Sequence, residues 1–262
     1  MTIKTLIKSF IYPIYEKRLL RRLDLKKTPH HIGVILDGNR RWSKENPSPT
    51  GDTSPRRGHK AGAEKIVELL DWCEDTQIGV VTLWLLSSDN FKRTSDEIES
   101  LLEVIQEAVE QLQAAGRWRI RPLGSLELLP ESLQQMLQDV AASTAAIDGI
   151  TVNVAIGYGG RLEIIDAVKR YISESASVGK NPSEIAESVT AESISKYLYT
   201  AGQPDPELVI RTSGEQRLGG FLLWQSHQSE FYFCEAYWPD FRRVDFLRAL
   251  RSYAVRERRL GR

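Results

Sequence analysis

The chain has 262 residues, of which 41% are hydrophobic and 27% charged, a composition typical of a globular protein with one large domain or two small ones. Its 35 basic and 35 acidic side chains balance, so the net charge does not indicate a nucleic-acid partner, and we expect none. Two distant cysteines, neither in a CxxC pair, argue against a zinc site or a disulfide framework and favour a reducing, cytoplasmic location.

Residues 1–28 are predicted to form a basic amphipathic segment ahead of the main domain, residues 29–262. Apolar residues recur there at helical spacing with lysines between them, and the pattern breaks near Pro13. Lys4 and Lys8 interrupt the segment, so it is not a signal peptide, and no apolar stretch approaches the roughly 20 residues of a membrane span. Two interpretations stay open: the segment packs on the domain surface, or it contacts the inner face of the cell membrane.

Short apolar stretches rich in β-branched residues predict strands at 31–36, 79–86, 118–123, 150–156, 207–211 and 230–235. Helical patterns lie between most of them, around 66–73, at 95–115, and near 131–143, 160–175, 190–199 and 242–257. The second of these helices begins with a capping-box signal from Thr94 to Glu97 and ends at Gly116. Because strands and helices alternate and the strands are apolar throughout, we predict a single α/β domain with a largely parallel sheet covered on both faces.

Two irregular stretches interrupt this pattern. Residues 43–58 contain three prolines and two glycines and are predicted to form a loop. Residues 176–190 are rich in serine and glutamate, and we interpret them as a surface connection.

Polar clusters follow several predicted strands, at the edge of the sheet where ligands bind in such folds. The first is Asp37-Gly38-Asn39-Arg40-Arg41-Trp42. Its glycine permits a sharp turn whose N–H groups can hold a phosphate, and the carboxylate of Asp37 can bind Mg²⁺. The second is Ser87-Ser88-Asp89-Asn90-Phe91-Lys92-Arg93. The structural alternatives are a plain capped turn for the first cluster and a helix cap for the second.

The third cluster, Arg211-Thr212-Ser213-Gly214-Glu215-Gln216-Arg217, places two arginines six residues apart, so that they can close on a diphosphate through bidentate contacts. The alternative is a surface turn with solvated charges. The fourth candidate is Glu230 in SEFYFCEAYWPDF, where a carboxylate is costly unless it is paired or binds a metal; Glu235 competes for this role. His59, in RRGHKAG at the start of a helix, is a further phosphate ligand, although a lone histidine is more often structural.

Common site motifs are absent from the sequence: GxxxxGK[ST], GxGxxG, GxSxG, HExxH and the DDxxD of all-helical prenyl synthases. These absences argue against a P-loop NTPase and a dinucleotide-binding domain. Arginines, one histidine and two carboxylates at strand ends remain, and this set suits two anionic diphosphates and Mg²⁺.

The sequence resembles the cis-prenyltransferase family, the undecaprenyl diphosphate synthase-like enzymes, from about His30 to the C-terminus. The resemblance rests on HIGVILDGNRRW, GHKAG, LLSSDNFKR, VNVAIGYGGR, DPELVIRTSGEQR and SEFYFCEAYWPDF, which occur in the family's order. It implies a homodimer with a six-stranded parallel sheet and a hydrophobic tunnel beside it. The implied activity is the Mg²⁺-dependent condensation of isopentenyl diphosphate with an allylic diphosphate, which makes a cis double bond. The sequence is most similar to the short-chain bacterial members.

The resemblance also implies roles for single residues. Asp37 binds Mg²⁺ and helps ionise the allylic diphosphate, Asn90 and Ser87 assist at the reacting centre, and Glu230 supplies a metal ligand from the dimer partner's side. The allylic diphosphate is held by the amides from Gly38 onward and by the surrounding residues Asn39, Arg40, Arg41, Trp42, His59 and Arg93. Isopentenyl diphosphate is held by Arg211, Arg217 and the position of Gly219, where the family often has serine.

Other departures from the family pattern bear on the site and the product. Glycine is common at the position of Arg40, and an arginine is common at Pro55, for which Arg56 or Arg57 is the substitute. Leu85 and Leu86 are expected at the tunnel, and long-chain members tend to carry alanine at Leu85. We therefore expect a short product, C15 from the C10 primer geranyl diphosphate. The alternatives are a medium- or long-chain polyprenyl diphosphate synthase, a non-catalytic partner subunit of one, or a phosphate-binding regulatory domain.

Overall fold

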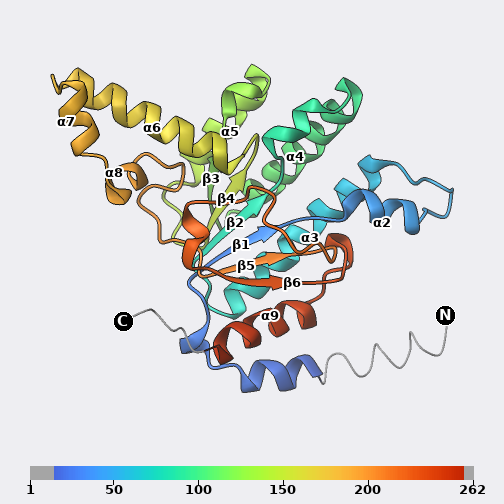
Figure 1. Cartoon of the computed structure of the whole chain (residues 1–262). Helices are drawn as coiled ribbons and strands as arrows, with labels where there is room; N and C mark the ends of the chain where they lie inside the picture. The colour runs from blue at the N-terminus through green and yellow to red at the C-terminus, as the bar shows by residue number, and fades with distance from the viewer. Residues whose placement is uncertain (1–14, 257–262) are drawn as a thin grey trace.

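A six-stranded sheet forms the centre of the computed structural model, which describes residues 15–256 (Figure 1). The strands are β1 (His31–Ile35), β2 (Val80–Trp84), β3 (Arg119–Leu123), β4 (Thr151–Ala155), β5 (Leu208–Arg211) and β6 (Glu230–Phe233). They lie in the order β3-β4-β2-β1-β5-β6, and each pair of neighbours is parallel. The predicted α/β fold with a parallel sheet is confirmed, and each strand begins and ends within two residues of the prediction.

The helices of the described residues include α2 (Asn39–Glu45), α3 (Pro55–Asp75), α4 (Ser95–Ala115), α5 (Glu131–Thr144), α6 (Gly160–Ser177), α7 (Pro182–Glu187), α8 (Ala191–Ser195) and α9 (Arg243–Val255). Residues 15–22 are also helical. In Figure 1, α6, α7 and α8 form an arm that extends away from the sheet, whereas α9 lies beneath it. Helix α4 has the predicted bounds, and α8 is shorter than the predicted 190–199.

Two stretches predicted as irregular contain helices, so these predictions were wrong in part. Helix α2 ends inside the expected loop 43–58, and α3 begins there at Pro55. Pro55 follows Ser54, whose side chain accepts a hydrogen bond from the Arg57 amide, so the proline begins a capped helix. In the same way Asn181 and Pro182 begin α7 within the expected connection 176–190. Pro55 was one of the three prolines that indicated a loop, although it occupies the first turn of a helix, whereas residues 176–190 were predicted as a connection from their serine and glutamate content.

The core lies mainly on one face of the sheet. Alternate residues of β1, Ile32 and Val34, belong to a large cluster with side chains of α3, α4, α5 and α9. Ile35 points to the opposite face, where a smaller cluster includes Phe221 and Leu222. A Cβ at Gly33 would lie 2.9 Å from the ring of Phe221, so this second layer packs directly on the backbone of β1. Both faces are therefore covered, as predicted, but by layers of different depth.

A row of buried polar side chains crosses the second face of the sheet, from the start of β1 to the middle of β2 and β4. His31 Nδ1 lies 2.7 Å from the carbonyl oxygen of Pro204, and His31 Nε2 lies 2.8 Å from Thr82 Oγ1. Asn153 donates a hydrogen bond of 2.9 Å to the same hydroxyl. A carbonyl oxygen can only accept, so His31 carries its proton on Nδ1 and accepts from Thr82 through Nε2. With a neutral imidazole, both ring nitrogens of His31 therefore have a hydrogen-bond partner.

The described part of the N-terminal segment packs against the domain. Leu19 and Leu23 are buried in the large core, and the guanidinium of Arg248 on α9 lies 5.3 Å from the centre of the Tyr15 ring. The amphipathic pattern over residues 3–14 lies outside the described residues. Among the residues that the structure describes, no helix is both long and apolar enough to cross a membrane. Cys73 and Cys234 are both buried, and neither forms a disulfide.

The strand order places a crevice between the carboxyl ends of β1 and β5. From β1 the chain continues to β2 on one side, and from β5 it continues to β6 on the other. Their outgoing loops therefore diverge, which is the arrangement that creates ligand sites in open parallel sheets. The loop after β1 contains Asp37, and β5 ends at Arg211.

Protonation of His31 is expected to weaken the fold at mildly acid pH. Burial lowers the pKa of His31 from its usual 6.5 to about 4, so the unfolded chain takes up a proton at a pH where the folded chain does not. Stability is then lost as the pH falls from about 6.5 toward 4, with a loss of about 2 kcal/mol already at pH 5. Urea unfolding of the wild type and of His31→Gln at pH 7.5 and pH 5 measures this loss.

The variant should show a smaller loss between the two pH values than the wild type. His227→Gln, which removes an exposed histidine, serves as the control and should behave as the wild type. An equal pH dependence in His31→Gln and the wild type would contradict the assignment.

Candidate functional site

A cavity of about 550 Å³ opens at the carboxyl edge of the sheet, above β1, β2 and β5. Its wall contains many of the polar residues that the sequence analysis selected, together with apolar ones. The lining residues are Ile35, Leu36, Asp37, Gly38, Asn39, Arg40, Arg41, Lys44, His59, Trp84, Leu85, Ser87, Asn90, Arg93, Leu101, Arg211, Arg217 and Gly219. Six of these residues carry a positive charge and one carries a negative charge, so the charge of the cavity wall favours an anion.

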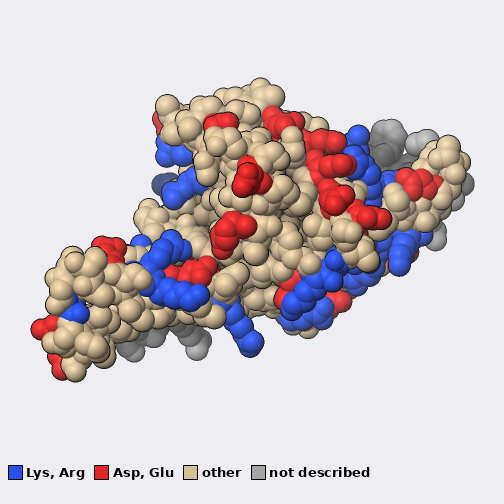
Figure 2. All heavy atoms as spheres, turned by 90° about the horizontal axis from the view of Figure 1, so that it is seen from above, with Lys and Arg blue, Asp and Glu red and all other residues tan. Residues whose placement is uncertain are grey.

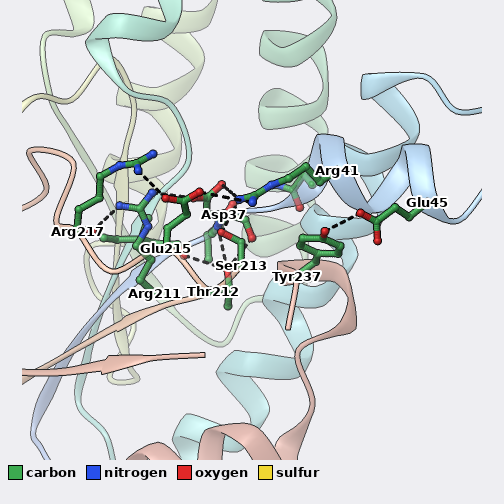
Figure 3. A network of polar contacts seen from close by, with 12 residues as sticks. Asp37, Arg41, Glu45, Arg211, Thr212, Ser213, Glu215, Arg217 and Tyr237 are labelled. Atoms are coloured by element: carbon green, nitrogen blue, oxygen red, sulfur yellow. Dashed lines mark hydrogen bonds and ion pairs between the residues drawn. The ribbon is translucent and has the colours of Figure 1, made fainter. Parts of the chain in front are cut away.

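Asp37 lies at the centre of a polar network (Figure 3). Its Oδ2 accepts a hydrogen bond of 2.7 Å from Arg211 Nη2, and its Oδ1 lies 3.7 Å from Arg41 Nη2. Thr212 Oγ1 lies 2.7 Å from the carbonyl oxygen of Asp37 and 3.0 Å from its amide nitrogen, which fixes the backbone. Burial acts to raise the pKa of Asp37, but the hydrogen bond and charge of Arg211 outweigh it and lower the pKa. The carboxylate is therefore ionised and can bind a cation.

The first turn of α2 brings unpaired backbone amides to the cavity wall. Gly38 precedes the helix with φ +106°, a conformation that favours glycine. The first intrahelical bond runs from the Trp42 amide to the Gly38 carbonyl, at 2.8 Å. The amides of Asn39, Arg40 and Arg41 precede that bond and have no partner within the helix. They are the amides that the sequence predicted as a phosphate cradle, and they lie at the positive end of the helix dipole.

Two glycines of α3 bring His59 to the same wall. A Cβ at Gly58 would lie 2.1 Å from the Asn39 carbonyl oxygen, and one at Gly62 would lie 2.4 Å from Asn39 Oδ1. His59 Nε2 and Asn39 Oδ1 are buried and have no hydrogen-bond partner in the described part of the chain. Burial, with the positive charges of Arg93 and Arg40, lowers the pKa of His59 to about 4. A neutral imidazole and an amide oxygen are thus available to a ligand.

The loop after β2 supplies another part of the wall. It contains the 3₁₀ helix η2 (Ser88–Lys92), in which Asn90 Oδ1 accepts a hydrogen bond of 2.9 Å from the Ser87 amide. Arg93 follows, and its Nη1 lies 2.9 Å from Glu97 of α4. Glu97 also lies 3.3 Å from Arg40 Nη1. The expected capping box of α4 does not form, because Thr94 makes no side-chain cap and Glu97 contacts these arginines.

The loop after β5 forms the wall opposite to His59 and Arg93. Arg211 donates a hydrogen bond to the Arg217 carbonyl, and Arg217 pairs with Glu215, as Figure 3 shows. Arg41 reaches across to this loop: its Nη2 donates to Ser213 Oγ at 2.7 Å, and its Nη1 lies 3.5 Å from Glu215. Two arginine-rich regions therefore flank Asp37, one on each side.

An apolar extension of about 40 Å³ continues from the cavity between α3 and α4. Leu36, Asn39, His59, Leu85 and Leu101 line both spaces, and the remainder of the extension is formed by Gly62, Ala63, Ile66, Val104, Ile105, Ala108 and Trp238. The polar cavity thus leads into a narrow apolar space, in the position where the sequence analysis expected a tunnel.

Three residues predicted for the site lie elsewhere in this chain. Trp42 points away from the cavity: its Nε1 donates to Asp240 at 2.9 Å, and the guanidinium of Arg57 lies 4.7 Å from its ring centre. Leu86 is buried in the core and lines neither space. Glu230 begins β6 at the amino edge of the sheet, opposite to Asp37, and pairs with Arg256. Parallel pairing through β5 forces this separation, because Glu230 aligns with Leu208, at the start of β5.

Neither arginine proposed as a substitute at Pro55 lines the cavity. Arg56 pairs with Glu103, and Arg57 contacts the Asn46 carbonyl and Trp42. The sequence analysis instead missed Lys44, Trp84 and Leu101, which do line it. Lys44 is one turn beyond Arg40 on α2, a signal that the predicted loop at 43–58 concealed. Trp84 lies in the predicted strand 79–86 and Leu101 in the predicted helix 95–115, and neither position indicates a role in the site from the sequence.

The residues present fit Mg²⁺ bound together with a substrate. No group of three or more potential metal-binding side chains occurs among residues 15–256, so this part of the chain does not form a complete cage. Mg²⁺ typically uses one or two carboxylates together with substrate phosphates and water. Asp37 provides one ionised carboxylate beside the phosphate cradle, which matches this mode.

Comparisons with known proteins agree with this geometry. Residues 35–261 match the family model of the undecaprenyl diphosphate synthase prenyltransferases. The chain is 55% identical over 256 residues to the (2Z,6E)-farnesyl diphosphate synthase of Thermobifida fusca, covering 98% of this chain and 99% of that protein. It is 48% identical over 259 residues to the short-chain Z-isoprenyl diphosphate synthase of Mycobacterium bovis, covering 98% and 97%.

A solved structure gives the same result for the fold. The crystal structure of lavandulyl diphosphate synthase from Lavandula x intermedia, in complex with dimethylallyl diphosphate, superposes with a TM-score of 0.81 at 30% identity. The alignment covers 90% of this chain and 100% of that one. The family match, the relatives and the cavity at the end of β1 lead to one conclusion: the chain belongs to the undecaprenyl diphosphate synthase family of prenyltransferases.

Proposed function

We propose that this protein is a Mg²⁺-dependent cis-prenyltransferase that condenses isopentenyl diphosphate with a short allylic diphosphate, most simply C10 geranyl diphosphate, to a C15 product. The observation that carries this proposal is the arrangement of two arginine-rich regions on either side of Asp37, above one narrow apolar extension. Two diphosphates and one hydrocarbon chain require these three features. The names of the relatives, a (2Z,6E)-farnesyl diphosphate synthase and a short-chain Z-isoprenyl diphosphate synthase, support the cis configuration and the short product.

The allylic substrate fits the wall formed by α2, α3 and the loop after β2. Its diphosphate would accept hydrogen bonds from the amides of Asn39 to Arg41 and from Arg93, while its chain enters the apolar extension past His59. Isopentenyl diphosphate fits the wall with Arg211, Arg217 and Gly219. In this arrangement the two substrates would lie side by side, with their reacting carbons toward Asn90 and Ser87.

In the reaction, the allylic C–O bond breaks, the terminal carbon of isopentenyl diphosphate forms a bond to allylic C1, and a proton leaves the isopentenyl C2. Negative charge accumulates on the leaving diphosphate, where the arginines and α2 amides stabilise it. A Mg²⁺ ion held by Asp37 and the phosphate oxygens would add further charge stabilisation. The apolar extension excludes water from the allylic chain, which protects a reactive carbocation-like centre.

The small volume of the extension favours the short-chain alternative over a medium- or long-chain polyprenyl synthase. The extension of about 40 Å³ is less than a tenth of the 550 Å³ cavity that leads to it. A non-catalytic partner subunit is disfavoured because the carboxylate of Asp37 and the arginines of both walls converge on one cavity.

A homodimer is part of the proposal. Ile165, Val168 and Ile172 form an exposed apolar stripe on α6, and Phe233 on the edge strand β6 is also exposed. Large apolar side chains of this kind are typical of surfaces that meet another chain. Glu230 lies far from Asp37 within one chain, so a role for it as a metal ligand would require the second copy. A cytoplasmic location, peripheral to the inner face of the cell membrane, also remains part of the proposal.

Asp37→Asn is expected to reduce turnover by several powers of ten while the protein stays folded. An amide retains an oxygen for the buried Arg211 but loses the charge that would bind Mg²⁺. Asparagine is a better choice than alanine, because alanine would leave the Arg211 guanidinium without its ion-pair partner. Incorporation of labelled isopentenyl diphosphate, with geranyl diphosphate and Mg²⁺, measures turnover. Asp240→Asn, which changes an exposed partner of Trp42, is the control and should remain active.

Failure of the wild type to incorporate label with any allylic primer would refute the proposed function. Turnover of a folded Asp37→Asn protein close to the wild-type value would refute the role of Asp37 alone.

Substitutions on the two arginine-rich walls are expected to affect the KM values of different substrates. Arg217→Ala should raise the KM for isopentenyl diphosphate about tenfold with little change in the KM for the primer, because one charge-assisted hydrogen bond is lost. Arg93→Ala should do the opposite. Arg217 is the cleaner test on its wall, since Arg211 also holds Asp37. Steady-state kinetics with each substrate varied in turn decides the assignment, and equal effects on both KM values would show that it is wrong.

Leu85 is expected to limit product length because it lies where the cavity passes into the apolar extension. Leu85→Ala removes three heavy atoms from this passage, so longer products should appear beside C15. Leu86→Val is the matched control: Leu86 is buried in the core outside both spaces, so this variant should lose some stability and keep the wild-type product. Chromatography of the dephosphorylated products reads the lengths. An unchanged product from Leu85→Ala would assign length control to another residue.

A further inference from the structure

Glu97 contacts two arginines of the cavity wall at once. Its Oε1 lies 2.9 Å from Arg93 Nη1 and 3.3 Å from Arg40 Nη1. Arg40 belongs to the first turn of α2, whereas Arg93 precedes α4, and both line the cavity. One carboxylate therefore links two separate segments of the chain that line the site.

Helix capping does not explain this contact. Glu97 is the third residue of α4, the position from which a glutamate normally closes a capping box, yet Thr94 makes no side-chain cap. The side chain is turned to Arg40 and Arg93 instead and is 22% exposed. Leu101, one turn further along α4, lines both the cavity and the apolar extension. Glu97 thus begins the face of α4 that looks into the site.

The carboxylates around the cavity share one arrangement. Asp37 contacts Arg41 and Arg211, Glu215 contacts Arg41 and Arg217, and Glu97 contacts Arg40 and Arg93. Each carboxylate bridges two arginines, as the oxygens of a diphosphate would. A bound diphosphate must compete with these carboxylates for the same N–H groups. At the wall next to His59 and the α2 amides, the competing carboxylate is that of Glu97.

We propose that Glu97 is a counter-ion that an entering diphosphate displaces from Arg40 and Arg93, and that its negative charge limits how tightly the site retains diphosphates. The proposal rests on the proposed function and adds a positioning residue that does not touch the reacting atoms. Glu97 keeps two flexible arginines at the mouth of the cavity before a ligand arrives. Once the ligand is bound, the displaced carboxylate remains close to it and repels it. This repulsion favours release of the inorganic diphosphate that each turnover produces.

Calorimetric titration with inorganic diphosphate in magnesium-free buffer tests the proposal without any turnover. Glu97→Gln should bind inorganic diphosphate about five- to tenfold more tightly than the wild type, because the repelling charge is gone while the side-chain shape is kept. Glu97→Asp retains the charge and should stay within about twofold of the wild type. Glu103→Gln is the matched control on the same helix, since Glu103 pairs with Arg56 outside the cavity wall, and should bind as the wild type does.

Unchanged or weaker binding by Glu97→Gln would overturn the proposal, because a merely structural glutamate can only weaken the site when it is lost. A crystal structure of the wild type with inorganic diphosphate gives an independent test: the Glu97 carboxylate should lie more than about 4 Å from at least one of the two arginines. Retention of both ion pairs beside bound diphosphate would also overturn it. Turnover by the wild type without tighter binding by Glu97→Gln would refute this inference alone. Absence of both turnover and diphosphate binding would refute the proposed function as well.

Discussion

The ion pair between Asp37 and Arg211 determines how the rest of the site is built. In the parallel ladder, Arg211 aligns with Ile35, so the sheet itself places the guanidinium beside the turn that follows β1. The Arg211 side chain is only 7% exposed, and a charge at this depth requires compensation. The carboxylate of Asp37 and the carbonyl of Arg217 provide it. The candidate metal ligand is therefore fixed by the last residue of a core strand and not by a surface loop.

The polar cavity and its apolar extension share a short boundary. Five residues line both spaces: Leu36, Leu85, Leu101, Asn39 and His59. The two polar residues carry buried atoms without hydrogen-bond partners among the described residues. A substrate with a diphosphate on an apolar chain would cross such a boundary once, at the carbon that bears the oxygen. Elsewhere, acidic and basic side chains are interspersed over the face shown in Figure 2, consistent with a net charge of zero.

The sequence was most informative where the spacing of apolar residues and the polar residues at the ends of the predicted strands indicate the same fold. Apolar strands that alternate with amphipathic helices predicted the parallel sheet, and polar clusters directly after β1, β2 and β5 predicted the site, because strand ends converge in such a sheet. Position along a strand was not used: Glu230 starts β6 whereas Asp37 follows β1, so in a parallel sheet they lie at opposite edges, as the pairing register shows. Side-chain direction was harder to judge. Trp42 and Leu86 adjoin site residues in the sequence, yet backbone geometry turns them to Asp240 and to the core.

The close contact of α2 with α3 has a consequence for how the site can move. Gly58 and Gly62 admit Asn39 at distances that no Cβ would allow, and Trp238 donates a hydrogen bond of 2.7 Å to the Gly62 carbonyl. The seven-residue α2 is thereby joined to the 21-residue α3 as one rigid body. The first turn of α2, with the predicted phosphate cradle, cannot move toward a ligand unless α3 and part of the core move with it. Movement around a ligand would then fall to the loops after β2 and β5, which line the rest of the cavity through residues such as Arg93 and Arg217. One side of the cavity is therefore built on two tightly packed helices, and the rest of its polar wall is built on loops.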